Sequence, residues 1–141
     1  MKISARNQLR GTVTAVHKGA VNADVLLELG GGLTIFANIT NEAVDDLGLK
    51  PGKAAMALIK SSSILLSPDA HIRISARNRL PGKITDVIPG AVNSEIKLAL
   101  AGGRALNAIV TVETVQDLGL TIGQPCTALI KASHVLIAVD A

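Results

Sequence analysis

Aromatic side chains are almost absent from this sequence. Its 141 residues include a single phenylalanine, Phe36, and neither Trp nor Tyr. Proteins that bind single-stranded nucleic acid use several aromatic rings as stacking platforms for the bases. The 14 basic residues are spread over both halves without a run, and the formal net charge is only +3, whereas clustered positive charge marks a surface that binds duplex nucleic acid. We therefore expect no nucleic-acid partner.

Cysteine and long apolar runs are also scarce. The single cysteine, Cys126, permits neither an intramolecular disulfide nor a metal site built from paired thiolates, so we expect a small buried residue there. The longest apolar stretches, such as residues 54–59, are too short to cross a bilayer, and the N-terminus lacks the apolar core of a signal peptide. These absences predict a cytoplasmic protein without a membrane partner.

What the sequence does contain is an internal repeat. Sliding the chain against itself by 71 residues aligns it without a gap, and about half of the aligned positions are identical. The matched motifs are Ser4–Asn7 with Ser75–Asn78, Gly19–Asn22 with Gly90–Asn93, Asp46–Leu49 with Asp117–Leu120, and Leu58–Lys60 with Leu129–Lys131. The repeat predicts one domain at residues 1–68 and another at residues 72–141. Domains this small are marginally stable alone, so we expect them to pack together or to oligomerise.

Each repeat has the pattern of a small β-domain. In the first repeat, short β-branched or alternating segments predict five strands, and a polar segment between the third and the fourth predicts a short capped helix. The expected strands are 11–16, 24–29, 33–39, 54–60 and 63–66, and the expected helix follows Thr40 and ends at Gly48. Gly30–Gly32 is expected to be a hairpin turn, because the Gly-Lys-Ser/Thr ending of a phosphate loop is missing. The order is typical of an all-β protein with two tandem OB-like five-stranded barrels.

Two polar segments of each repeat are candidates for binding an anion. Ser4–Asn7 supplies a hydroxyl, a guanidinium, an amide and backbone N–H groups just before the first strand. Lys60–Ser63 follows the most apolar strand and is matched by Lys131–His134. One such segment would be explained by turn chemistry or by a solvated lysine. Because both recur at the same offset, we interpret them as the two parts of a split anion site.

These motifs resemble the Mop or molbindin family of molybdate-binding domains over the whole length of the chain, twice. The resemblance rests on the Ser-Ala-Arg-Asn segments, the Gly-Ala-Val-Asn turns, the Asp-Leu-Gly-Leu segments and the Ala-Leu-Ile-Lys strand endings. It implies a cytosolic, two-domain binding protein that forms a homotrimer. It also implies that molybdate or tungstate is held without covalent chemistry at interfaces between subunits or domains.

The resemblance further implies a set of ligand residues. Ser4, Ala5 and Arg6 would meet Lys60 and Ser61 of a neighbouring domain, with matching contacts in the second repeat. The full set is Ser4, Ala5, Arg6, Asn7, Thr40, Lys60, Ser61, Ser62, Ser75, Ala76, Arg77, Asn78, Thr111, Thr114, Lys131, Ala132 and Ser133, with a further class of site at Asn22 and Asn93 near a symmetry axis. The first repeat has Ala43 where the second has the hydroxyl of Thr114, so the implied sites differ in affinity.

The chemistry of molybdate agrees with this donor set. Near pH 7 molybdate is a tetrahedral dianion that accepts hydrogen bonds and offers no proton, so donors alone select it over protonated phosphate. We therefore expect no carboxylate to face the site. The expected role is storage, buffering or delivery of the oxyanion inside the cell, and the alternative is a molybdate-responsive regulatory module that acts through a partner protein.

An enzyme is not expected. The three histidines, His17, His71 and His134, are not repeated, and no nucleophile with an orienting base is recognisable. Clusters of His, Cys or acidic residues with the spacing of a metal site are also missing.

Overall fold

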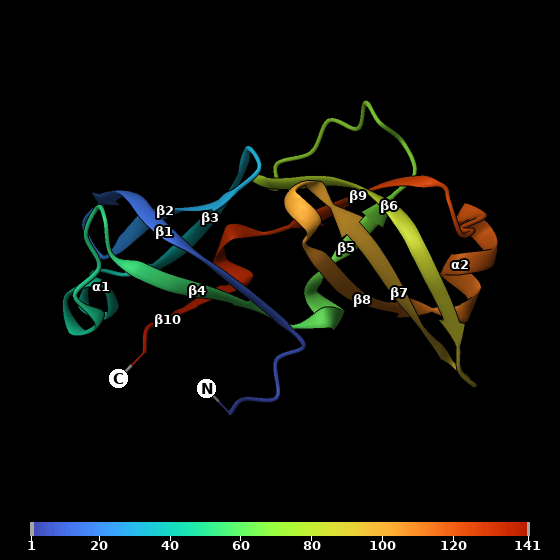
Figure 1. Ribbon diagram of the computed structural model, residues 1–141, viewed down its shortest axis with the longest axis horizontal. Helices are drawn as coiled ribbons and strands as arrows, with labels where there is room; N and C mark the ends of the chain where they lie inside the picture. Colours follow the sequence, from blue (N-terminus) through green and yellow to red (C-terminus); the bar gives the residue numbers. More distant parts are fainter. Residues whose placement is uncertain (1, 141) are drawn as a thin grey trace.

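The computed structural model describes residues 2–140 and consists of two curled five-stranded antiparallel sheets that lie end to end (Figure 1). The first repeat forms β1 (Asn7–Lys18), β2 (Asn22–Gly30), β3 (Leu33–Thr40), α1 (Asn41–Leu47), β4 (Ala54–Ile59) and β5 (Leu65–Ser67). The second forms β6 (Asn78–Pro89), β7 (Asn93–Leu100), β8 (Ala105–Thr111), α2 (Val112–Leu118), β9 (Pro125–Ile130) and β10 (Val135–Ala138). The predicted all-β class and the position of each helix are confirmed.

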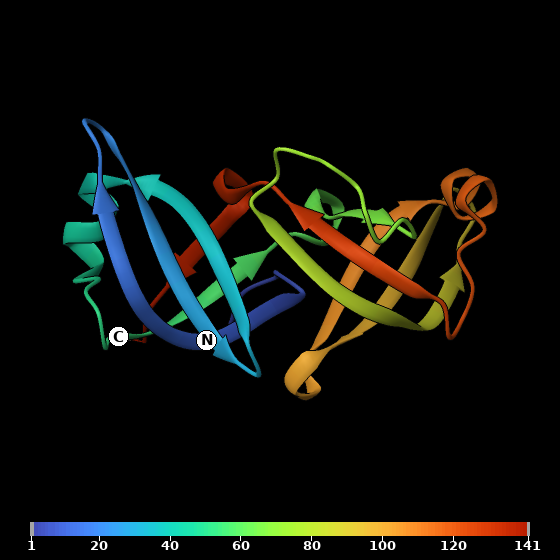
Figure 2. The ribbon, with the colours of Figure 1, turned by 90° about the horizontal axis from the view of Figure 1, so that it is seen from above.

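The two repeats exchange their last strands. One sheet has the order β10-β4-β1-β2-β3 and the other β5-β9-β6-β7-β8, so β10 lies in the half that contains β4, and β5 lies in the half that contains β9 (Figures 1 and 2). The sequence predicted that a strand at 63–66 would complete the barrel of its own repeat. The strand forms, as β5, but it pairs with β9 of the other repeat, so the predicted pairing is wrong. After β4 the chain forms a 3₁₀ turn, η1 (Ser61–Ser63), that packs against β8 and directs the following strand into the other sheet.

The core is built by the alternation that the sequence predicted. Val25, Leu27 and Leu29 of β2 are buried, with at most 5% of each exposed, and Leu26 between them is not fully buried. Cys126 is 3% exposed, and this burial raises the pKa of its thiol, which fits the expected small core residue. None of the helices within residues 2–140 has the length and apolar composition needed to span a membrane.

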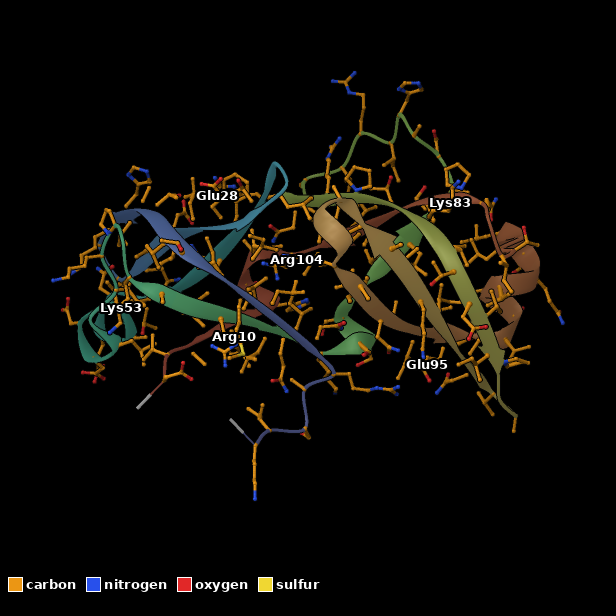
Figure 3. The ribbon with its side chains drawn as sticks, viewed as in Figure 1. Arg10, Glu28, Lys53, Lys83, Glu95 and Arg104 are labelled. Carbon is orange, nitrogen blue, oxygen red and sulfur yellow. The ribbon has the colours of Figure 1, made fainter. Side chains whose placement is uncertain are left out.

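Glycines mark two places where backbones come close. A Cβ on Gly11 would lie 2.4 Å from the carbonyl oxygen of Glu28 on the paired strand, so β1 and β2 approach more closely here than any side chain allows. The predicted turn at Gly30–Gly32 has positive φ at all three residues, and its tip lies against the corresponding turn of the other half at Gly102. Beside this contact Arg104 donates from Nε and Nη2 to the carbonyl oxygen of Leu29, at 3.0 and 2.6 Å (Figure 3 labels Arg104).

Candidate anion-binding sites

The first pocket combines the two polar segments of the first repeat. Asn7 of β1 is opposite Ile59 of β4 in the antiparallel ladder, so the residues before β1 and after β4 lie at the same end of the sheet. The pocket between them has a volume of about 390 Å³. It is lined by Ser4, Ala5, Arg6, Lys60, Ser61 and Ser62, with Ile3, Leu58, Ile109 and Leu136 as the apolar walls. Within one chain, β-pairing of the first repeat brings Ser4–Arg6 and Lys60 to the same pocket, and the other repeat contributes Ile109 and Leu136. Contact of Ser4–Arg6 with the lysine of a neighbouring domain stays a prediction.

The second pocket region is related to the first by the 71-residue offset. Two adjoining pockets of about 430 and 310 Å³ share Ser75 and Lys131. One is also lined by Ala76, His134, Ile74, Ser62, Ser63 and Leu65, and the other by Arg77, Ala132, Ser133, Asp24 and Asn38. The structure thus assembles the second predicted cluster as well, and again the opposite repeat completes the wall.

Each pocket has one exposed lysine, and the first pocket also has free backbone donors. Lys60 and Lys131 form no salt bridge with any residue in 2–140. Within the same part of the chain, the backbone N–H groups of Ala5 and Ser62 donate to no protein acceptor. An uncompensated ammonium beside free N–H groups favours an anion.

The two predicted arginines are paired with carboxylates of the opposite repeat. Arg6 forms a salt bridge with Glu95 of β7, and Arg77 Nη1 lies 2.9 Å from Asp24 Oδ2 of β2. Asp24 also lines the second pocket, so the expectation that no carboxylate faces a site is wrong there. The carboxylate is tolerated because Arg77 and the Asn38 side chain, whose Nδ2 is 2.9 Å from Asp24 Oδ1, compensate its charge.

Asp24 should make the stability of the fold depend on pH in the acid range. The hydrogen bond from Asn38, together with the contact with Arg77, outweighs the opposing effect of burial and holds the pKa of Asp24 below the ordinary value of an aspartate. A depressed folded-state pKa stabilises the fold above the unfolded pKa, and this stabilisation is lost as pH falls through the folded pKa. We therefore expect Asp24→Asn to lower the urea midpoint at pH 7 and to have less effect below about pH 3.8. The effect should be small, since 36% of the Asp24 side chain is exposed.

The control for this prediction is Asp117→Asn on α2. Asp117 is exposed and forms no salt bridge within residues 2–140. Its substitution should leave the pH dependence of the urea midpoint as it is in the wild type. An equal effect of Asp24→Asn at pH 7 and pH 3 would contradict the assignment.

Asn7 and Asn78 serve as structural bridges between the halves. Asn7 is 2% exposed; its Oδ1 accepts from the N–H of Asn107 at 2.7 Å, and its Nδ2 donates to the carbonyls of Asn107 and Ile59 at 2.8 and 3.1 Å. Asn78, 1% exposed, makes the equivalent pair of bonds with the backbone of Phe36, at 2.7 and 2.8 Å. The side-chain amides of both residues are buried and bonded across the interface between the halves, which gives them a structural role. Their role as ligands stays a prediction.

Other predicted ligands lie elsewhere or have a different role. Ser61 is 4% exposed and its hydroxyl donates to Asn107 Oδ1 at 3.0 Å, so its hydrogen is not available to an anion. Thr40 and Thr111 cap the helices by accepting from the N–H groups of Ala43 and Thr114, at 3.1 and 3.0 Å.

The remaining predicted positions are outside the two pocket regions. Thr40, Thr111 and Thr114 are absent from their linings, which are drawn from residues 2–140, so these residues stay a prediction that requires a second copy. Asn22 bonds the side chain of Asn38 at 3.3 Å, and Asn93 lines a separate pocket of about 250 Å³ with Glu95.

The carboxylates that pair with Arg6 and Arg77 were not predicted from the sequence. Asp24 and Glu95 are 71 residues apart, so a carboxylate at the same position of both repeats was a usable signal. Asn107 and Asn38 gave no such signal, because the corresponding residues are Phe36 and Ile109. Their roles follow only from the packing of one repeat on the other.

Comparison with known proteins identifies the repeat unit. A TOBE domain matches residues 3–66 and again residues 74–137. The molybdenum-pterin-binding protein MopA of Rhodobacter capsulatus is 45% identical over 139 residues, which are 98% of this chain and 52% of that protein. The molybdenum transport protein ModE of Azotobacter vinelandii is 40% identical over 139 residues, 99% of this chain and 52% of that protein. The chain therefore spans about half the length of these relatives.

A solved structure matches over the full length of both chains. The cytoplasmic molybdate-binding protein ModG, in a crystal form with molybdate bound, superposes with a TM-score of 0.96 at 46% sequence identity. The match covers 99% of this chain and 100% of that one.

Proposed function

Because the chain belongs to the TOBE domain family, with one domain in each repeat, we propose that it is a molybdate-binding protein that has no enzymatic activity. The observation that carries the proposal is the pairing of Ser4–Arg6 with Lys60–Ser62, repeated as Ser75–Arg77 with Lys131–Ser133. Each pair surrounds an exposed lysine that has no carboxylate partner among residues 2–140. The similarity to ModG, whose structure was determined with molybdate bound, supports the same ligand.

The site chemistry suits a fully deprotonated tetrahedral dianion. Lys60 and Arg6 supply positive charge, and the Ser4 hydroxyl and the N–H groups of Ala5 and Ser62 are donors at the same pocket. Tungstate has the same charge and shape as molybdate, so both are expected ligands. Sulfate is a smaller dianion, and its rejection depends on how well a cavity of this size surrounds the ion.

We also propose that the sites are completed by assembly into a homotrimer. Ile3, Leu65 and Leu136 are large apolar residues at the pockets, with 46%, 58% and 62% of each exposed. Exposed apolar residues grouped beside a binding site are typical of a surface that a partner covers. A second copy would bury them and would bring Thr40 or Thr111 to the ion, as the family resemblance implies.

The proposed cellular role is storage, buffering or delivery of the oxyanion in the cytoplasm. ModG, which is matched over its full length, is a cytoplasmic molybdate-binding protein, which supports this role. Some relatives are named transcriptional regulators, including ModE of Escherichia coli, which is 35% identical over 139 residues and of which the match covers 52%. The regulatory alternative is not favoured by these comparisons.

Calorimetric titration combined with light scattering tests the proposal. We expect heat of binding with molybdate and with tungstate, little heat with sulfate at the same concentration, and the mass of a trimer at saturation. Two classes of site are expected, because the first pocket has Ser61 and Ile109 where the second has Ala132 and Asn38. A protein that gives no heat with either metal oxyanion would overturn the proposal.

A further inference from the structure

Asn107 and Phe36 occupy the same position in the two repeats and use their backbones alike. Each pairs through its N–H and C=O with a buried asparagine of the opposite half, Asn107 with Asn7 and Phe36 with Asn78. The seam, by which we mean the interface between the two halves, therefore has the same asparagine-to-backbone hydrogen bonds in both repeats. Any difference between the two sites has to come from the side chains.

The Asn107 side chain is linked to both polar segments of the first site, the one that contains Arg6 and the one that contains Lys60. Its Oδ1 accepts from the Ser61 hydroxyl at 3.0 Å, and its Nδ2 donates to Glu95 Oε1. Glu95 in turn holds Arg6. One residue of the second repeat thus anchors the turn that follows Lys60 and, through Glu95, the arginine of the Ser4–Asn7 segment.

Within residues 2–140, the second site keeps a carboxylate, an arginine and an amide donor, as Asp24, Arg77 and Asn38, but no side chain links them to the turn that follows Lys131. The ring of Phe36 lies under the guanidinium of Arg77, with 4.6 Å between Arg77 Cζ and the ring centroid, and the residue that corresponds to Ser61 is Ala132. Asp24, which corresponds to Glu95, is held by Asn38 and lines the second pocket. The residues that line the first pocket, all within 2–140, do not include Glu95, which lies in the neighbouring pocket beside Asn93.

We propose that Asn107 is a positioning residue that keeps the Glu95 carboxylate out of the first pocket, so that the first site binds a dianion more tightly than the second. The inference rests on the proposed function. Its physical basis is charge: a carboxylate a few ångströms from a dianion in a partly desolvated site weakens binding. Glu95 has a bond to Asn107 that holds it aside while it still orients Arg6, whereas Asp24 has its hydrogen-bond partners within the second pocket itself.

The test is a rescue experiment. Asn107→Leu frees Glu95 and should weaken molybdate binding at the first site by about tenfold or more, with the second site unchanged. Adding Glu95→Gln should restore most of the affinity, because the amide carries no charge and still accepts from Arg6. A merely structural role of Asn107 would not be rescued by Glu95→Gln, since removing the charge does not replace the lost hydrogen bonds.

Several control variants assign the measured affinities to the two sites and separate a failure of this inference from a failure of the proposed function. Lys60→Ala and Lys131→Ala identify which calorimetric component belongs to which site, and Phe36→Leu should leave the first site unchanged. Asn107→Ser is the milder variant if the leucine lowers the melting temperature strongly, and the same rescue is expected there. If the wild type binds no oxyanion, the proposed function fails. If it binds and Asn107→Leu leaves the first site intact, or Glu95→Gln gives no rescue, the inference is overturned while the proposed function stands.

Discussion

Replacing Val135 with aspartate is expected to lower the free energy of unfolding by about 3–5 kcal/mol, a large part of the stability of a small protein. Val135 begins β10 and is 1% exposed. It lies opposite Ile59 of β4, which is fully buried. An aspartate there would place an unpaired charge in the core of the half that is otherwise built by the first repeat. Urea unfolding followed by circular dichroism measures the effect.

The matched control is Thr12→Asp, on β1 of the same sheet. Thr12 is exposed and is not among the residues 2–140 that line either pocket region, so the same charge should cost little stability. Hydrogen exchange then tests the strand exchange itself. In Val135→Asp the amides of β4 should lose protection before those of β9, because β10 pairs with β4. Faster exchange in β9 with β4 unchanged would contradict the observed topology.

Local features of the fold were predictable from the sequence. The β2 alternation and the short helix after Thr40 each depend on neighbouring residues. The helix cap illustrates this, since the Thr40 hydroxyl accepts from the N–H of Ala43 and Gly48 ends the helix with a φ of 64°. Such capping requires only a side chain that accepts a hydrogen bond at the N-terminus of the helix and a residue free to adopt positive φ at its C-terminus.

The strand exchange was not predictable, because the repeats resemble each other too closely. Leu58-Ile59 of β4 and Leu129-Ile130 of β9 present the same side chains to a fifth strand. Pairing within a repeat and pairing between repeats therefore satisfy the same hydrophobic pattern. The choice depends on where the chain travels after Ser61–Ser63, and no periodicity encodes that direction.

The candidate site, too, was predictable from the sequence only in part. Ser4–Arg6 and Lys60 could be expected to cooperate, since both recur at one offset, and the β1–β4 ladder joins them. The bridging role of Asn7 could not be expected, because its partner Asn107 is 100 residues away and belongs to the other repeat. A buried carboxamide and a ligand carboxamide look identical in a sequence; only the packing of the seam separates them.

Lys60→Ala and Lys131→Ala are expected to have the largest effects on ligand binding, each at one class of site. Each ammonium is exposed at its pocket and is not engaged by a carboxylate in the described chain. A charge-assisted hydrogen bond to an anion contributes about 1.5–3 kcal/mol, so each variant should weaken its own site by roughly 10- to 100-fold. Calorimetric titration of both variants and of the double variant measures the two losses separately.

A third lysine separates a local contact from a general effect of charge. Lys83 is exposed on β6 (Figure 3) and is not among the residues 2–140 that line either pocket region. Lys83→Ala removes the same unit of charge. At one ionic strength it should leave both affinities nearly unchanged, because exposed charges beyond a Debye length are screened. Similar weakening by all three substitutions would mean that net charge attracts the anion without defined sites. Selective losses at Lys60 and Lys131 would instead require two sites, one for each copy of the repeat, since each lysine follows the strand that pairs with its own Ser-Ala-Arg-Asn segment.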